Sequence, residues 1–146
     1  MNRLLIDSGI DEEDTWDFVF ADSFDHYYDE PSTVPVKAPS NPNSPFISKT
    51  PKECSRLLLE LCEDTDSEII PHYFMIMDER SLRDDTVLLV SAGIEAPVEM
   101  VRATFGASAQ AIVLYLTGHR GIEEDSESAA EEEDGVYHGG SLVTIP

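Results

Sequence analysis

The sequence predicts a single α/β domain in which a mixed sheet of four to five strands is flanked by helices. Short apolar runs, typical of buried strands, alternate with stretches whose apolar residues recur at helical spacing. The length of 146 residues suits one domain. The expected order of elements is β-α-linker-α-β-β-α-β-α, and an α+β arrangement is the alternative.

The two clearest strands lie near the middle of the chain, at 72–77 and 86–91. Each contains an apolar run that is too short for a buried helix and rich in aromatic, β-branched and aliphatic residues. Between them, residues 78–85 are almost entirely polar. We therefore expect two core strands joined by a charged loop.

The N-terminal part predicts a strand at 3–7, a helix at 11–24 and then a linker. The apolar face of that helix is expected to contain Trp16, Val19, Phe20 and Phe24. Proline and serine are frequent in 29–49, and proline interrupts the hydrogen bonding of both helices and sheets. This segment is therefore expected to be a surface linker or an insertion within the domain.

A helix that begins at Pro51 has the clearest start signal in the chain. Thr50 suits the N-cap, proline suits the first helical position, and Glu53 completes a capping box. The helix is expected to end before Asp64, with a buried face made of Cys54, Leu57, Leu58, Leu61 and Cys62. Its two cysteines would lie about 12 Å apart along the axis. This is too far for a disulfide, so we expect reduced thiols.

Another helix is expected over 97–106, because proline suits the first turn of a helix and glycine is common at its end. Its apolar residues Val98, Val101 and Phe105 would face inward. Arg102 would lie on the opposite side of this helix and face solvent.

The C-terminal part predicts a buried strand at 111–117 and an acidic helix at 122–134. Eight carboxylates lie within 122–134, and like charges four residues apart weaken a helix, so disorder is the alternative there. A last apolar cluster at 142–145 is expected either to form an edge strand or to belong to a loose tail over 141–146.

The charge balance is the strongest global signal for function. Thirty acidic and nine basic residues give a formal net charge of −21. Such a charge repels nucleic acids and anionic membranes, because binding to phosphate depends on lysine and arginine. It favours a basic protein partner.

The same sequence predicts a location inside the cell. The N-terminus lacks the basic and apolar regions of a signal peptide. The longest apolar run near the C-terminus is too short to span a membrane. We expect a cytoplasmic protein, with the nucleus as the alternative, and not a secreted one.

Three motifs invite a comparison: DTW at 14–16, MDERSLRDDTVLLV at 77–90 and DGVYHGG at 134–140. Together they resemble a small α/β family of fungi and bacteria that is known only as a domain of unknown function. The resemblance would cover 1–18 and 72–140, with the proline-rich segment as an insertion. The segment AIVLYLTGHRG departs from the family, whose members are more polar there. Because the family has no established activity, the resemblance implies a fold rather than a function.

The charged connector contains the candidate contact residues, Arg80, Arg83, Asp84 and Asp85. Local ion pairs that order the connector are the first interpretation, and each exposed pair contributes under about 1 kcal/mol. The alternative is contact with a ligand or partner, since arginine can bind a carboxylate or phosphate through two hydrogen bonds.

A second hypothesis concerns Asp7, Asp78 and Asp85, which follow or flank predicted strands. Carboxylates that meet at one edge of an α/β sheet can hold Mg²⁺ or Mn²⁺. Turn and cap roles are the simpler interpretation of such aspartates. The chain contains no specific catalytic motif and indicates no other cofactor. We therefore expect a non-enzymatic binding or regulatory module, with a metal-dependent hydrolase or phosphotransfer enzyme as the alternative.

Overall fold

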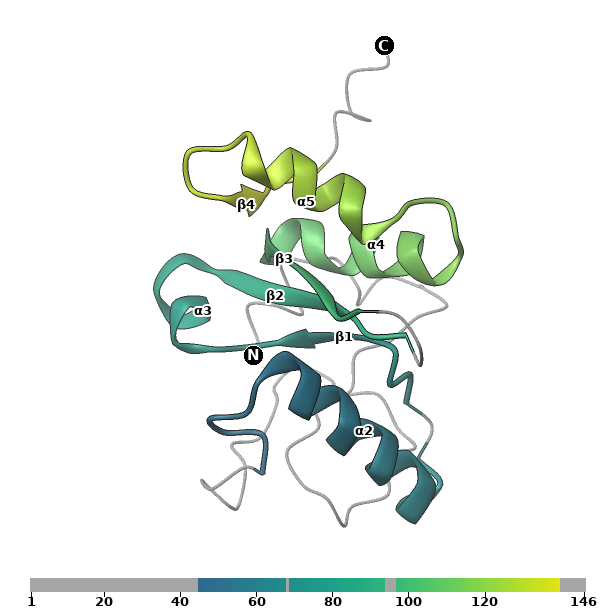
Figure 1. The fold of residues 1–146 in the computed structure, drawn as a ribbon. Helices are drawn as coiled ribbons and strands as arrows, with labels where there is room; N and C mark the ends of the chain where they lie inside the picture. The colour runs from purple at the N-terminus through teal and green to yellow at the C-terminus, as the bar shows by residue number, and fades with distance from the viewer. Residues whose placement is uncertain (1–44, 68, 94–96, 140–146) are drawn as a thin grey trace.

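The computed structural model describes residues 45–67, 69–93 and 97–139. The described helices are α2 (Pro51–Thr65), α3 (Glu79–Asp84), α4 (Phe105–Leu116) and α5 (Ile122–Ala130). The described strands are β1 (Tyr73–Ile76), β2 (Thr86–Ser91), β3 (Glu99–Thr104) and β4 (Val136–Tyr137). Figure 1 shows the sheet at the centre, with helices on both sides of it.

The four strands form one mixed sheet in the order β1-β2-β3-β4. β1 and β2 are antiparallel, as are β2 and β3, whereas the short β4 lies parallel to β3. The predicted mixed sheet flanked by helices is therefore confirmed. Because β4 pairs only with Arg102 and Ala103, it covers a small part of β3.

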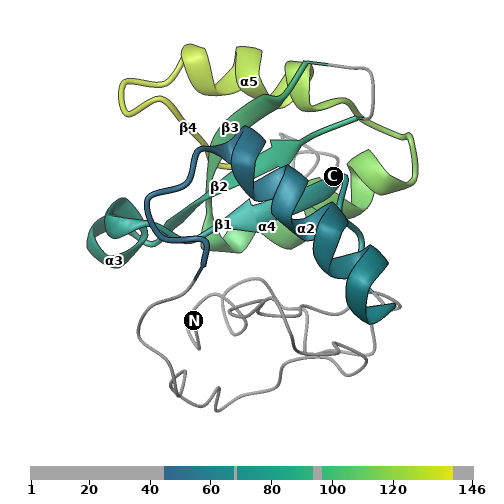
Figure 2. The same ribbon diagram turned by 60° about the horizontal axis from the view of Figure 1, so that its bottom comes forward.

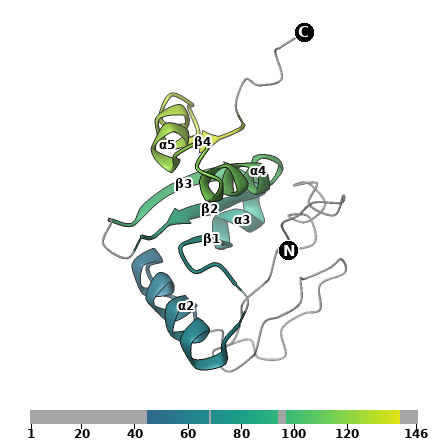
Figure 3. The same ribbon diagram turned by 90° about the vertical axis from the view of Figure 1, so that its right-hand side faces the viewer.

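Each face of the sheet packs against different helices. Leu89 of β2 lies opposite Met75 and Val101, and this face packs under α4 and α5. On the other face, Phe74 of β1 packs with Leu61 of α2. Figure 1 and Figure 3 show α4 and α5 on one side of the sheet and α2 on the other. Figure 2, turned toward α2, shows this helix crossing over the strands.

The predicted start of α2 is confirmed. The Thr50 hydroxyl accepts a hydrogen bond from the Glu53 amide at 3.1 Å, and the Glu53 carboxylate accepts one from the Thr50 amide at 2.7 Å. The helix ends at Thr65, slightly later than expected, and Asp66 follows in the left-handed conformation with a φ of 58°. Cysteines 54 and 62 both lie on α2 and both are free, in agreement with the prediction.

The helix predicted over 97–106 is wrong, because the structure has strand β3 there. Val101 and Ala103 are buried, and their neighbour Arg102 points to the opposite face. This alternation is the period of a strand. Of the three apolar residues that suggested a helix, Val98 precedes β3, Val101 lies within it and Phe105 is the first residue of α4. Arg102 does not face solvent, since its side chain is only 12% exposed.

The strand predicted over 111–117 is also wrong, because this segment forms most of the second half of α4. The Thr104 hydroxyl caps the helix by accepting a hydrogen bond from the Ala107 amide at 3.2 Å. Ala111 and Tyr115, four residues apart, are both buried, which is the spacing of one helical face. The apolar run is therefore the end of a mostly buried helix, which periodicity alone does not distinguish from a strand.

The charged connector is not a loop but helix α3, which the Asp78 side chain caps by accepting from the Ser81 amide at 3.1 Å. In the acidic segment predicted as a helix, α5 occupies Ile122–Ala130. The predicted elements at 3–7, 11–24 and 142–145, and most of the linker, lie outside the described residues. Within the described ranges, no helix is both long and apolar enough to cross a membrane.

Two leucines, one buried and one exposed, allow a test of the packing between the sheet and its helices. Leu89 is fully buried, whereas Leu82 on α3 is 83% exposed. Leu89→Ala is expected to lower the free energy of unfolding by about 2–5 kcal/mol, because it leaves a cavity between the sheet and α4. The matched variant Leu82→Ala should change it by less than about 0.5 kcal/mol. Urea denaturation of the full chain measures both, and equal losses would contradict this packing.

Candidate functional site

The candidate residues of the connector lie in and around α3, at one corner of the sheet. Arg80 forms an ion pair with Asp84, with 2.7 Å between Nε and Oδ2. The same guanidinium donates a hydrogen bond to the backbone carbonyl of Asp134 at 3.1 Å. Arg80 therefore joins α3 to the loop that precedes β4. The predicted local ion pair is confirmed for this arginine.

A second ion pair joins Asp78 to Arg102 of β3. Arg102 Nη1 lies 3.1 Å from Asp78 Oδ1, and Nη2 donates to Oδ2. Nη1 also donates to the Thr86 hydroxyl at 3.1 Å. The guanidinium thus reaches from β3 across β2 to the N-terminus of α3.

Thr86 links the two ion pairs into one network. Its hydroxyl accepts from Arg102 and donates to Asp84 Oδ1 at 2.6 Å. This hydrogen bond lowers the pKa of Asp84 below its ordinary value, and Arg80 acts in the same direction. No buried side-chain nitrogen or oxygen among the described residues lacks a hydrogen-bond partner. The corner is therefore a satisfied structural network.

The remaining candidates are Arg83, Asp85 and Asp7. Arg83 is exposed and makes no ion pair within the described part of the chain. Asp85 ends α3 in the left-handed conformation, with a φ of 57°, at the opposite end from Asp78. Asp7 lies outside the described residues. Among those residues, no group of three or more His, Cys, Asp or Glu side chains could hold a metal ion.

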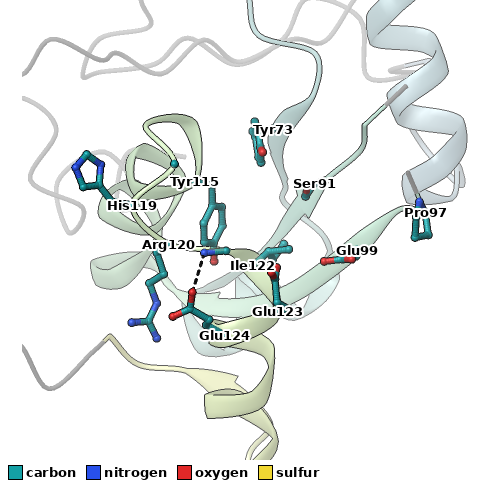
Figure 4. Close-up of a pocket in the computed structure, with 12 residues that line it drawn as sticks. Tyr73, Ser91, Pro97, Glu99, Tyr115, His119, Arg120, Ile122, Glu123 and Glu124 are labelled. Carbon is teal, nitrogen blue, oxygen red and sulfur yellow. Dashed lines mark hydrogen bonds between the residues drawn. The ribbon is translucent and has the colours of Figure 1, made fainter. Parts of the chain in front are cut away.

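A separate pocket of about 400 Å³ opens between the strands and the α4–α5 loop. Its residues come from β1, β2, β3 and the segment just before it, the end of α4, the loop that follows α4 and the start of α5 (Figure 4). They are Tyr73, Ser91, Pro97, Glu99, Tyr115, Gly118, His119, Arg120, Gly121, Ile122, Glu123 and Glu124.

The wall of this pocket is held by the buried carboxylate of Asp125. Its Oδ2 accepts a hydrogen bond from the Tyr115 hydroxyl at 2.5 Å, and its Oδ1 pairs with Arg120 Nε. Burial raises the pKa of Tyr115 above its ordinary value, and the hydrogen bond to Asp125 raises it further. The separate hydrogen bond that Arg120 donates to Asp125 raises the pKa of Arg120. Tyr115 therefore stays a neutral donor and Arg120 a cation.

Two aromatic rings and three carboxylates give the pocket its chemistry. The ring centroids of Tyr73 and Tyr115 lie 6.2 Å apart. The carboxylates belong to Glu99, Glu123 and Glu124, which are all exposed residues. In Figure 4 the side chain of His119 points away from these groups. The arrangement combines aromatic surface with negative charge.

Sequence reasoning missed every residue of this pocket. Tyr115 lies within the segment predicted as a strand, and Asp125 is one of eight carboxylates in the predicted acidic helix. One signal was present, because Ile122, Asp125 and Ala129 recur at the spacing of one helical face. An acid between two apolar positions on that face indicates a buried carboxylate with a partner. No local pattern identifies Glu99 or Tyr73, which meet the other residues only through the fold.

The ion pair of Asp78 predicts a pH-dependent stability. Burial acts to raise the pKa of Asp78, but hydrogen bonds from Arg102 and Ser81 outweigh it, so the pKa lies below its ordinary value. A carboxyl with a lowered pKa stabilises the fold above its unfolded pKa of about 3.9, and this stabilisation is lost as the pH falls through the folded pKa.

We therefore expect Asp78→Asn to lower the free energy of unfolding by about 1 kcal/mol at neutral pH. The expected loss of free energy is small because the Asp78 side chain is 37% exposed, so that solvent screens its charge. The difference from the wild type should shrink as the pH falls below the unfolded pKa of about 3.9 and through the lower folded pKa, and urea denaturation at a series of pH values measures it. Asp64→Asn on α2, an exposed position, is the control. A difference that persisted in acid would contradict the assignment.

Comparisons of the chain with protein-family models, with curated proteins and with solved structures give no match. The resemblance carried by 14–16, 77–90 and 134–140 therefore stays a prediction. Function has to be argued from the chemistry of the described residues themselves.

Proposed function

We propose that the protein is a non-enzymatic binding module that binds a basic protein partner through the acidic end of α5. The acidic end consists of four exposed carboxylates, Glu127, Glu131, Glu132 and Glu133. None of the four forms an ion pair with another described residue. This surface is complementary in charge to a cationic protein surface.

The carboxylates of the acidic end do not stabilise α5. The C-terminus of a helix has a partial negative charge, which favours cations and disfavours acids. The last turn of α5 contains no basic residue. Glu127 and Glu131 are four residues apart, so their charges repel one another. A basic partner would relieve this repulsion, which supports binding as the role of the acidic end.

The backbone under the acidic end is ordered before any partner binds. α5 buries Ile122, Asp125 and Ala129 against the rest of the domain. After the helix, the amides of Glu131 and Glu132 donate to backbone carbonyls at 3.3 and 3.1 Å. A surface that is ordered in advance loses little conformational entropy on binding.

Arg80 and Arg120 do not neutralise the acidic end, because each is paired with another carboxylate. Arg80 is paired with Asp84, and Arg120 is paired with Asp125. The net charge of −21 also disfavours nucleic acids and anionic membranes. No observation on the described residues favours a metal-dependent hydrolase, since the carboxylate of Asp78 is bound to Arg102.

The experiment compares two charge-reversal variants of the full chain. Glu127→Lys with Glu131→Lys changes the acidic end, and Glu60→Lys with Glu63→Lys changes exposed positions near the end of α2. Both variants have the same net charge, so long-range attraction is matched. The probe is a fluorescent lysine-rich peptide, titrated at low and at moderate salt.

We expect the α5 variant to bind the peptide about tenfold more weakly than the α2 variant, because it loses two contacts and gains two repulsions. Binding by the wild type should weaken with salt. Equal affinity of the two variants, or binding that salt does not change, would contradict the proposal.

A further inference from the structure

We infer that the pocket lined by Tyr73, Tyr115, Glu99 and Glu123 binds an arginine side chain of the basic partner. This inference rests on the proposed function and adds the kind of residue that is recognised. The pocket adjoins the N-terminal end of α5, whereas the acidic end lies at the C-terminal end of the same helix. One partner could therefore contact both.

The charge of the pocket selects a cation. Glu99, Glu123 and Glu124 contribute three carboxylates, and one oxygen of Glu124 accepts a hydrogen bond from the Gly121 amide at 3.3 Å. The carboxylates are not arranged as a metal site in the described part of the chain. An organic cation does not need a close shell of oxygen ligands. It therefore suits these separate carboxylates better than a metal ion does.

The cation of the pocket wall, Arg120, is ion-paired with Asp125, and of these carboxylates Glu124 also raises its pKa. The guanidinium of Arg120 is bound to Asp125 and lies over the ring of Tyr137, 5.7 Å from its centroid. His119 is also directed elsewhere, with its Nδ1 2.9 Å from the Thr117 hydroxyl. Arg120 shows that a guanidinium is stable in this region when a carboxylate and a tyrosine ring surround it.

The aromatic surface favours arginine over lysine. Tyr115 is only 4% exposed and its hydroxyl is bound to Asp125, so the ring of Tyr73 is the aromatic surface available to a ligand. Tyr73 is only partly buried and its ring is tilted 37° from that of Tyr115. A guanidinium is planar and weakly hydrated, so it stacks on tyrosine more readily than an ammonium does. The pocket volume of about 400 Å³ lies within the range of ligand-binding pockets.

The absence of a side chain at Gly121 allows Glu123 to lie at the pocket. A Cβ atom built on Gly121 would approach the carboxylate oxygens of Glu123 to 2.6 Å. A larger residue would therefore displace this carboxylate.

The experiment measures the preference between two fluorescent peptides of equal length and charge, one rich in arginine and one rich in lysine. The pocket variant is Glu99→Gln with Glu123→Gln. The control is Glu131→Gln with Glu132→Gln, which changes the net charge equally but lies outside the pocket. All four substitutions are at exposed positions, so folding should be retained, and circular dichroism checks this.

We expect the wild type to bind the arginine peptide about fivefold more tightly than the lysine peptide. The pocket variant should lose this preference, and the control should keep it while binding both peptides more weakly. Equal, salt-sensitive binding of both peptides by the wild type would overturn the pocket and leave the proposed function standing. A preference that persisted in the pocket variant would overturn the pocket as well. Failure to bind either peptide would overturn both.

Discussion

The arrangement of the α4–α5 half of the domain depends on the buried carboxylate of Asp125. This side chain is fully buried, and it is bound to the Tyr115 hydroxyl and to Arg120. A buried charge is tolerated only when it is paired and hydrogen-bonded, so these partners have to stay in place. The contacts attach α5 to α4 through the loop between them. They thereby position both the pocket and the acidic end of the helix.

A different polar network holds the other end of the sheet. Arg102 reaches from β3 to Asp78, and Thr86 connects this pair to Asp84 and Arg80. Together they join α3, β2, β3 and the loop before β4. Three arginines of the described residues form ion pairs within these two networks. They are Arg80, Arg102 and Arg120. Among the described residues, Glu127, Glu131, Glu132 and Glu133 form no ion pair, so the surface that we propose for a partner keeps its negative charge.

Local chemistry explains where sequence interpretation was correct. The capping box of α2 involves residues three apart, and the strands at 72–77 and 86–91 have flanking polar residues that separate them from helices. Interpretation failed over 97–117, where a strand and a helix follow one another without an intervening loop. Val101 and Phe105 fit a helical spacing but belong to different elements. Thr104, the last residue of β3, is also the cap of α4, so the boundary has no turn residue to mark it.

Composition and local spacing were enough to predict the fold class, the α2 helix, the two central strands and the strong negative charge. These features depend on composition or on residues a few positions apart. Only the tertiary structure decided that Arg102 pairs with Asp78 and that Tyr73, Glu99 and Tyr115 meet at one pocket. Their contacts join residues that are distant in the chain, and such contacts arise from strand pairing and helix packing. The physical reason is that periodicity describes one face of one element, whereas a site requires the faces of several elements to converge.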